Sequence, residues 1–349
     1  MANAANPKSE IPNPQSSGWI EQVLAHRQPA AVPYNFMFSP PARQSLLQHY
    51  GLERGLEDFL EFPIRMTAPK SIKPLYADPD HFGETVTDEF GVVWTTSKID
   101  RGSPVGPSLK EASLRGFQFP DPAAAYRFED MAKFCAREAG HYRIVWVGDL
   151  WERATFMRGM DSILMDWVLE PAFVDELLRR LTDHILATMR ILFGRFQFEG
   201  VALSDDYGTQ RGLLMSPADW RARIKPLLRE IYALAKQNGR TVFHHSCGCV
   251  RAIVPDLIEI GLDILHPIQP ETMDIFELKR EFGRDLTFCG GVGTQELLPF
   301  GAPEQIRAEV RKLKREMGAG GGYILEPGIT LQADVPLANL VALIEEARA

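Results

Sequence analysis

Residues 241–268, TVFHHSCGCVRAIVPDLIEIGLDILHPI, decide the fold because they contain two strand patterns and one helix pattern in a row. The apolar runs at residues 241–247 and 262–268 have the length and composition of buried strands. Between them, residues 250–261 space their apolar positions as a helix does, and Gly261 ends that helix. Two strands joined by a helix lie parallel in one sheet, so this stretch predicts a parallel β/α unit.

The same unit recurs on both sides of this stretch. Further strands are predicted at residues 142–149, 200–206, 285–291 and 321–327, and further helices at residues 121–140, 173–192, 216–239, 274–283, 303–318 and 336–348. The five consecutive strand–helix units from residue 200 onward predict a parallel sheet covered by helices. Their regular spacing, without a glycine-rich GxGxxG turn after the first strand, favours an α/β fold of the (β/α)8 barrel type over a doubly wound sheet.

The first 120 residues do not follow this rhythm, because prolines and glycines recur there without a helix or strand period. The exception is residues 84–97, ETVTDEFGVVWTTS, where two β-rich runs on either side of a turn predict a β-hairpin. Residues 1–18 are polar and rich in Pro, Asn and Ser, so we expect a flexible N-terminus. Residues 19–349 are then expected to form a single barrel domain, with regular units from about residue 140 to residue 349.

The composition excludes several classes of protein. The chain has 349 residues, of which 45% are hydrophobic, and this is enough for a sizeable core. Its net charge of -8 offers no basic surface to nucleic acid or to an anionic membrane. No apolar run reaches the roughly 18–20 residues that span a bilayer, and the N-terminus lacks an apolar signal core, which predicts a cytoplasmic protein. The four cysteines are too few for a disulfide framework and indicate packing, metal binding or catalysis.

Polar side chains gather where the predicted strands end, and barrels carry their chemistry at these C-terminal strand ends. Alternation along residues 241–247 puts His245 and Cys247 on one face, so an imidazole and a thiolate point the same way. Such a pair suits zinc, with Cys289 or Glu326, each at the end of a later strand, as the third ligand. Three protein ligands would leave an open position, as in catalytic zinc sites. The alternative is that the cysteines are small buried groups and the histidines hydrogen-bonded core residues.

Two acidic residues, Asp205 and Asp206, end the predicted strand at residues 200–206. One of them is expected to face the mouth of the barrel, where a carboxylate acts as a general base, orients a substrate or holds a ligating histidine. The alternative is a turn or a helix cap. Arg153, just after the strand at residues 142–149, is a candidate clamp for a substrate carboxylate, or alternatively one half of a structural ion pair.

Other residues near the predicted strand ends are candidates for contacting a substrate. Trp151, Met157 and Tyr207 would suit the wall of an apolar pocket, although such residues more often belong to the core. His266 and Gln269, at the end of the strand at residues 262–268, are further candidates for substrate binding.

Four motifs in the second half of the chain are specific as a set. They are SDDYGTQRGLLMSPADW (204–220), TVFHHSCGCV (241–250), TFCGGVGTQELLPFG (287–301) and GGYILEPG (321–328). Together they resemble the uroporphyrinogen decarboxylase superfamily, over roughly residues 140–347 and more loosely before them. The resemblance implies a distorted (β/α)8 TIM barrel with an irregular N-terminal extension, which would contain the hairpin.

That superfamily contains at least two chemistries, and its decarboxylases fit this sequence poorly. The porphyrinogen decarboxylases need no cofactor and use arginines near the N-terminus to hold the carboxylates of a tetrapyrrole, with an aspartate facing the pyrrole nitrogens. The corresponding segment here, AHRQPAAVPYNFMFSPPARQ, has only Arg27 and Arg43. A net negative chain without that arginine cluster is a poor receptor for such a substrate.

The zinc-dependent methyltransferases of the superfamily fit better. They work with corrinoid proteins and thiols, and they carry a His-x-Cys pair at a strand end and a further cysteine near the last strand. His245 and Cys247 match the pair, whereas Ile329 stands where the later cysteine is expected. Cys289 or Glu326 would therefore have to complete the zinc site.

The sequence thus predicts a zinc-dependent methyl (C1) transferase or demethylase component that acts on a small organic methyl donor. The acceptor would be a thiol or a corrinoid, the latter supplied by a partner protein, and a homodimer is left open. One alternative is a cofactor-free decarboxylase, in which Asp205 or Asp206 stabilises the intermediate and Arg153 orients the carboxylate. A second alternative is a barrel without catalysis that serves as a binding subunit.

Overall fold

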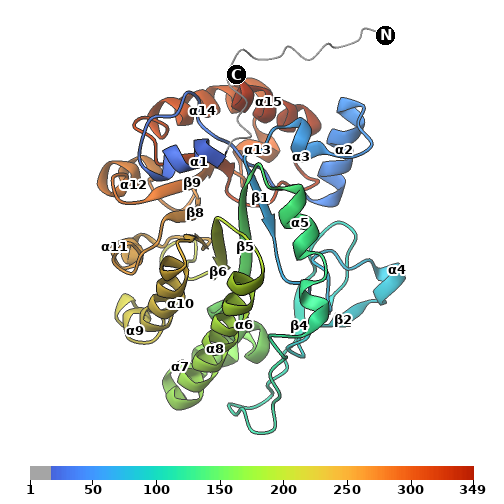
Figure 1. Ribbon diagram of the computed structural model, residues 1–349, viewed down its shortest axis with the longest axis vertical. Helices are drawn as coiled ribbons and strands as arrows, with labels where there is room; N and C mark the ends of the chain where they lie inside the picture. The colour runs from blue at the N-terminus through green and yellow to red at the C-terminus, as the bar shows by residue number, and fades with distance from the viewer. Residues whose placement is uncertain (1–16) are drawn as a thin grey trace.

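The computed structural model describes residues 17–349 and contains the parallel sheet that the sequence predicts (Figure 1). The strand order is β1-β5-β6-β7-β8-β9-β10, and every neighbouring pair is parallel. The strands are β1 (Ile64–Thr67), β5 (Tyr142–Asp149), β6 (Gly200–Ser204), β7 (Thr241–His245), β8 (Ile264–Ile268), β9 (Thr287–Val292) and β10 (Tyr323–Pro327). The register sets Ser204 opposite His245 and His245 opposite His266, so polar side chains of three strands meet at one end of the sheet.

An extended segment near the N-terminus closes the sheet into a barrel. Tyr34 forms a parallel bridge with Leu325 of β10, and the N–H of Asn35 donates to Leu325 O at 3.1 Å. On the other side, the Tyr34 ring packs edge-on against Phe62, just before β1, with ring centroids 5.8 Å apart. The segment therefore takes the eighth strand position between β10 and β1. The predicted α/β fold, a distorted (β/α)8 TIM barrel, is confirmed. Side-chain contacts join the N-terminal segment to the region of β1.

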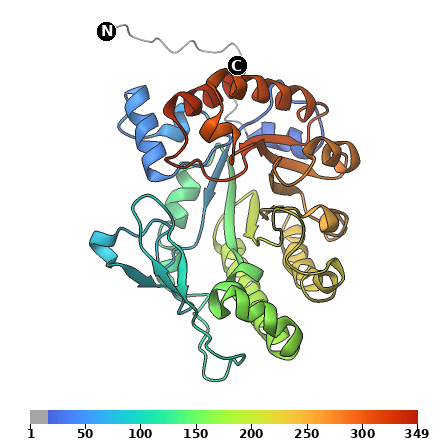
Figure 2. The same ribbon diagram turned by 180° about the vertical axis from the view of Figure 1, so that it is seen from behind.

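Helices cover the outer face of this sheet (Figures 1 and 2). The longest, α8 (Pro171–Arg195), buries Leu177, Leu181 and Ile185 at the spacing of one helix face. The other helices that follow strands in the barrel are α6 (Trp151–Arg158), α7 (Met160–Leu169), α9 (Pro217–Arg223), α10 (Lys225–Gln237), α11 (Val254–Glu259), α12 (Ile275–Phe282), α13 (Leu297–Phe300), α14 (Pro303–Glu316) and α15 (Leu337–Arg348), with the 3-10 turn η2 (Arg251–Ile253) before α11. Among the helices of residues 17–349, none is long and apolar enough to cross a bilayer.

Two of the longer predicted helices are divided in the structure, and the helix predicted at residues 250–261 likewise begins as η2 and continues as α11. The helix predicted at residues 216–239 breaks at Ile224 into α9 and α10, because Pro226 lacks an N–H and its ring crowds the carbonyl one turn before it. The helix predicted at residues 121–140 is a 3-10 turn, η1 (Ala125–Phe128), followed by α5 (Met131–Arg137). None of these changes alters the order of the strands.

The predicted hairpin is confirmed as part of a small antiparallel sheet. Strands β2 (Thr85–Thr87) and β3 (Val93–Thr95) form it, and β4 (Pro104–Gly106) adds a third strand. Asp88 holds the turn, because its Oδ1 accepts hydrogen bonds from the N–H groups of Phe90 and Val92 at 2.9 and 3.0 Å. The remaining helices of this part of the chain are α2 (Pro40–Tyr50), α3 (Leu56–Phe59) and α4 (Pro79–Phe82).

The inside of the barrel is an apolar cluster separate from the larger core between sheet and helices. It consists of Ile64, Tyr142, Ile144, Ala202, Phe243, Ile264, Cys289 and Ile324, together with Ile20 and Val23 from helix α1 (Ser17–Leu24). Val23 O also accepts a hydrogen bond from the N–H of Gly322, immediately before β10 begins. Helix α1 therefore closes the N-terminal end of the barrel. Residues 1–16 of the predicted flexible N-terminus (1–18) lie outside the described residues, whereas residues 17 and 18 already belong to α1.

Candidate active site

The C-terminal ends of β6 and β7 carry a first group of side chains that could hold a metal. It consists of Asp206, His245 and Cys247, whose ligand atoms lie within 4.8 Å of one another. His245 Nε2 is 3.4 Å from Cys247 Sγ and 3.4 Å from Asp206 Oδ1. The N–H of Cys247 also donates to Asp206 Oδ1 at 2.7 Å. His245 and Cys247 thus face one another, as the strand alternation predicts, and all three side chains are only partly buried.

The charges in this first group favour a proton or a cation. Burial lowers the pKa of His245, but the hydrogen bonds with Asp206 and Cys247 outweigh burial and raise this pKa to about 10. Burial opposes ionisation of Asp206, whereas the interaction with His245 lowers its pKa. The two residues therefore form an imidazolium–carboxylate pair, and a metal ion would compete with its proton.

A second group lies deeper, between β8, β9 and β10, and consists of His266, Cys289 and Glu326. Cys289 Sγ donates to Glu326 Oε2 at 3.0 Å, and His266 Nε2 lies 3.8 Å from the same oxygen. All three side chains are buried, and His266 Nε2 makes no hydrogen bond within residues 17–349. Burial raises the pKa of Glu326 to about 8, raises that of Cys289 and lowers that of His266, so burial favours the neutral form of each.

The two groups are joined through their histidines, because His245 Nδ1 and His266 Nδ1 share a hydrogen bond of 2.9 Å. This arrangement corrects the expected third ligand beside His245 and Cys247, which was Cys289 or Glu326. These four side chains do not form one group, because the last two lie with His266 instead. Asp206, expected as a catalytic residue, is the third member of the first group. His266, expected to contact a substrate, belongs to the second group inside the barrel and links that group to His245.

Two glycines hold the loops that carry the first group. A Cβ on Gly208 would lie 2.6 Å from Cys249 N and 2.7 Å from Cys247 O. Gly248 has a φ of +81°, and a Cβ there would lie 2.4 Å from the carbonyl carbon of Gly208. The N–H of Gly248 donates to Gln269 Oε1 at 2.6 Å, so Gln269, expected to bind substrate, supports this loop.

The side chain of Asp205 caps the start of helix α6 and is not placed as an active-site base. Its side chain is buried, and its Oδ1 accepts from the N–H groups of Leu150 and Glu152, both at 2.9 Å, at the start of α6. Its Oδ2 accepts from the hydroxyl of Tyr207 at 2.8 Å. Burial raises the pKa of Asp205 well above its usual value. The expected catalytic role of Asp205 is therefore replaced by a structural one, since its neighbour Asp206 faces the mouth.

Three expected pocket residues lie in the core. Trp151 and Met157 are fully buried between sheet and helices, and the Trp151 ring packs edge-on against Trp167 with centroids 5.3 Å apart. Tyr207 is fully buried as well, beside Asp205. Trp151 and Met157 of α6 therefore belong to the core, which was the alternative interpretation of these residues.

Arg153 lines a cavity but is already paired. Its Nη1 donates to Asp88 Oδ2 at 2.8 Å, its Nη2 lies 3.3 Å from Asp149 Oδ2, and its guanidinium stacks over the Phe90 ring at 4.6 Å. The expected clamp for a substrate carboxylate is therefore an ion-pair link between α6, β5 and the hairpin. This corresponds to the structural ion pair that was the alternative interpretation, with Asp88 and Asp149 as partners.

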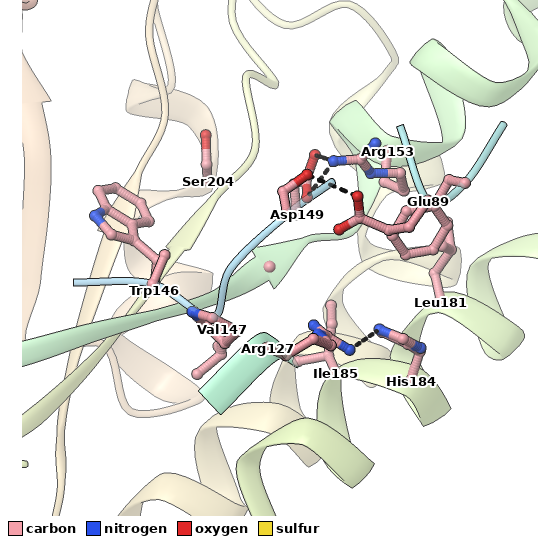
Figure 3. Close-up of a pocket in the computed structure, with 15 residues that line it drawn as sticks. Glu89, Arg127, Trp146, Val147, Asp149, Arg153, Leu181, His184, Ile185 and Ser204 are labelled. Atoms are coloured by element: carbon pink, nitrogen blue, oxygen red, sulfur yellow. Dashed lines mark hydrogen bonds and ion pairs between the residues drawn. The ribbon is translucent and has the colours of Figure 1, made fainter. Parts of the chain in front are cut away.

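The cavity beside the first group has a volume of about 240 Å³ and lies at the C-terminal end of β5 (Figure 3). Trp146 and Ser204 line it on the side of the barrel interior, and the Trp146 ring centroid is 6.4 Å from that of His245. Arg127 and His184 face one another in another part of its wall. The cavity therefore adjoins the first group of ligands.

Sequence reasoning missed several of these residues. Trp146 could have been found, because it alternates with Ile144 along β5 and so points into the barrel. Glu152 is a second omission: it accepts a hydrogen bond from Ser204 Oγ at 2.5 Å, and burial, with nearby acidic groups, raises its pKa to about 7. Arg127 lies in a 3-10 turn before β5 and has no motif around it that could have revealed it.

Comparisons with known proteins agree with this architecture. The family model described as "Uroporphyrinogen decarboxylase (URO-D)" matches residues 137–349. A protein described as "Uroporphyrinogen decarboxylase", from Pseudoalteromonas atlantica, is 26% identical over 251 residues, which are 68% of this chain and 68% of that protein. A solved structure described as a methyltransferase from Methanosarcina mazei matches with a TM-score of 0.71 over 95% of this chain and 98% of that chain, at 16% identity. At that identity, the likeness shows the shared fold.

Proposed function

Because this chain belongs to the uroporphyrinogen decarboxylase (URO-D) family, we propose that it acts like the zinc-dependent methyltransferases of that superfamily. It would transfer a methyl (C1) group from a small organic donor, or serve as the demethylase component of such a system. The acceptor would be a thiol or a corrinoid that a partner protein supplies. The superfamily of the chain, which the sequence motifs indicated, is confirmed, and the chemistry is our proposal.

The observation that carries this proposal is the first group, Asp206, His245 and Cys247, at the open end of the barrel. Zinc bonds to sulfur, nitrogen and oxygen are about 2.0–2.3 Å long, so tetrahedral ligand atoms lie roughly 3–4 Å apart. The two separations of 3.4 Å from His245 Nε2 already suit such an ion. Zinc bound there would supply the ability to keep a thiol as thiolate, or to polarise a donor oxygen, at neutral pH.

The neighbouring cavity supports a small donor. Its volume of about 240 Å³ is below the range of about 300–1,000 Å³ that is usual for pockets of drug-sized ligands. Trp146 lines the cavity with its ring centroid 6.4 Å from that of His245, and so supplies an apolar wall beside the first group. A donor in this cavity would therefore place its methyl group near His245 and Cys247.

Cofactor-free decarboxylation receives less support from the same residues. Its candidate groups included Asp205 and Arg153. The two carboxylate oxygens of Asp205 already accept three hydrogen bonds, and Arg153 is paired with two aspartates. A tetrapyrrole is also too large for the cavity. Of that candidate site, only Asp206 still faces the open end.

Elemental analysis for zinc, on protein purified without chelators, tests the proposal. The wild type is expected to hold near-stoichiometric zinc, and Cys247→Ser and His245→Ala are expected to lose it. Cys249→Ser is the matched control, because Cys249 lies in the same loop, packs against the core and belongs to neither ligand group. A wild type without zinc, or an equal loss from Cys249→Ser, would contradict a zinc site at the first group.

Two further measurements separate the remaining hypotheses. Cys289→Ser should keep its zinc if the ion belongs to the first group, and should lose it if the second group is the true site. A zinc-loaded protein can then be incubated with aryl methyl ethers and reduced free corrinoid, whose methylation changes its visible spectrum. Transfer that disappears in Cys247→Ser supports the proposed reaction, whereas zinc without any transfer favours the binding subunit.

A further inference from the structure

The cavity at the end of β5 contains a buried arginine without an acidic partner. Arg127 is 8% exposed, and its hydrogen bonds, both from Nη1, go to His184 Nε2 at 3.1 Å and to Pro122 O at 3.4 Å. Among residues 17–349, no carboxylate oxygen lies within 4.0 Å of this guanidinium, and its Nε makes no hydrogen bond. Its guanidinium thus lies in the cavity wall without an ion pair, and the acidic residues Glu89 and Asp121 act on its charge from beyond 4.0 Å (Figure 3).

Every other charged side chain of the cavity wall has a partner. Arg153 is bound by Asp88 and Asp149, and Glu89 accepts hydrogen bonds from the hydroxyl of Ser71 and the N–H of the next residue, at 2.6 and 3.2 Å. His184 adds no charge beside Arg127, because burial, together with the nearby arginines, lowers the pKa of His184 to about 4 and keeps the imidazole neutral. Arg127 is therefore the cation of this wall that has no ion pair and that an anionic ligand could pair.

Burying a charge without a partner destabilises a folded protein, and a ligand that supplies the partner removes this cost. A guanidinium matches a carboxylate especially well, because its N–H groups form parallel hydrogen bonds with both oxygens. The nearby wall contains the rings of Phe90 and Trp146 and the side chains of Leu181 and Ile185. These apolar surfaces suit the flat body of an aromatic ligand.

We propose that the cavity binds a small aromatic carboxylic acid, with its carboxylate on Arg127 and its ring between Phe90 and Trp146. The carboxylate accepts hydrogen bonds from the free guanidinium nitrogens, and the opposite end of the ring points towards Ser204 and His245. The identity of this acid as the methyl donor rests on the proposed function, whereas its binding does not. The sequence-based expectation of an arginine clamp is thereby transferred from Arg153 to Arg127.

Calorimetric titration with benzoate and with its neutral counterpart benzamide tests the inference. Wild-type protein is expected to prefer benzoate, and Arg127→Gln should weaken benzoate binding by about tenfold or more, as expected for lost hydrogen bonds to a charged group. Benzamide binding should change little. Arg190→Gln, on the exposed side of α8, is the matched control and should bind both compounds like the wild type. Equal binding of the two compounds by the wild type, or unchanged benzoate binding by Arg127→Gln, would overturn the inference.

Thermal unfolding of the same proteins tests whether the Arg127→Gln variant is folded. Because Arg127→Gln removes an unpaired buried charge, it should melt no lower than the wild type in the absence of ligand. Saturating benzoate should raise the melting temperature of the wild type but not that of the variant. A variant that melts lower and still gains stability from benzoate would show that Arg127 is structural.

The zinc content of these preparations separates this inference from the proposed function. Benzoate binding that depends on Arg127 in protein without zinc would sustain the carboxylate site and contradict zinc-dependent methyl transfer. Zinc-loaded protein that does not bind benzoate would contradict the carboxylate site alone. A folded wild type that neither holds zinc nor binds benzoate would overturn both.

Discussion

The contact between Gly208 and Gly248 allows a steric prediction for the loops that carry Asp206 and Cys247. An alanine Cβ at residue 208 would lie 2.6 Å from Cys249 N, and ordinary contacts begin at 3.4 Å. The loops would therefore have to separate by about 0.8 Å, the difference between these distances. The atoms involved belong to the backbone and cannot rotate away, so we expect Gly208→Ala to destabilise the protein by about 1–3 kcal/mol, as overpacking does elsewhere.

The same separation should weaken metal binding. Moving the backbone of Cys247 shifts its Sγ relative to His245 Nε2, and displaced supports of metal ligands typically cost about 10–100-fold in affinity. Urea unfolding measures the first effect, and competition for zinc with a chromophoric chelator measures the second.

Gly212 provides the control within the same loop, since a Cβ there meets nothing within 4 Å. Gly212→Ala should stay within about 0.5 kcal/mol of the wild type, as most surface substitutions do. If Gly208→Ala unfolded at the same urea concentration as Gly212→Ala and held zinc equally well, the two loops would not be in the contact described, and the argument would fail.

Two further predictions concern buried groups away from the first ligand group. Asp205→Ala removes the acceptor of three hydrogen bonds at the start of α6 and should cost about 2–4 kcal/mol in urea unfolding, and a variant as stable as the wild type would contradict the capping role. His184 has a pKa of about 4 when folded and 6.5 as its ordinary value, so the unfolded chain binds more protons between these pH values. The unfolding free energy should therefore fall by about 3 kcal/mol from this residue alone as the pH drops through that window, and His184→Gln, measured at pH 7 and at pH 4.5, should show a smaller decrease than the wild type.

The parts of the structure that follow from local periodicity were predictable. Strand and helix periods along residues 142–348 gave the parallel units, and alternation along β7 put His245 and Cys247 on one side. The turn residues between β2 and β3 indicated the hairpin. Each of these inferences uses residues that lie within a few positions of one another, where backbone geometry alone relates the side chains.

The grouping of ligands was not predictable in this way. Asp205 and Asp206 are adjacent, and the strand ends at Ser204, so alternation could not tell which carboxylate faces the mouth. That choice is made by the cap on α6 and by the contact of Gly208 with Gly248, which joins residues far apart in the chain. Likewise, Cys289 and Glu326 pair with each other because β9 and β10 are neighbours in the sheet.

Arg127 could not be predicted as a site residue from the sequence, for a different reason. Its significance lies in the absence of an acidic partner among residues 17–349, and a sequence shows which residues are present but not which charges remain unpaired after folding. Arg153 had the better position after a strand, but the hairpin residue Asp88 neutralises it. Long-range pairing of charges thus removes the role expected of Arg153, and it leaves Arg127 as the arginine of the cavity without an ion pair.

Helix α1 and the apolar side chains packed inside the barrel close the first group off from the N-terminal end of the barrel. Ile20 and Val23 fill the end opposite to His245 and Cys247, so whatever enters must leave through the same opening. An acceptor protein docked over that opening would trap the donor and its demethylated product beneath it. Methyl transfer at this site would then follow a compulsory sequence, in which the donor enters first, the acceptor arrives second, and the demethylated product is released last.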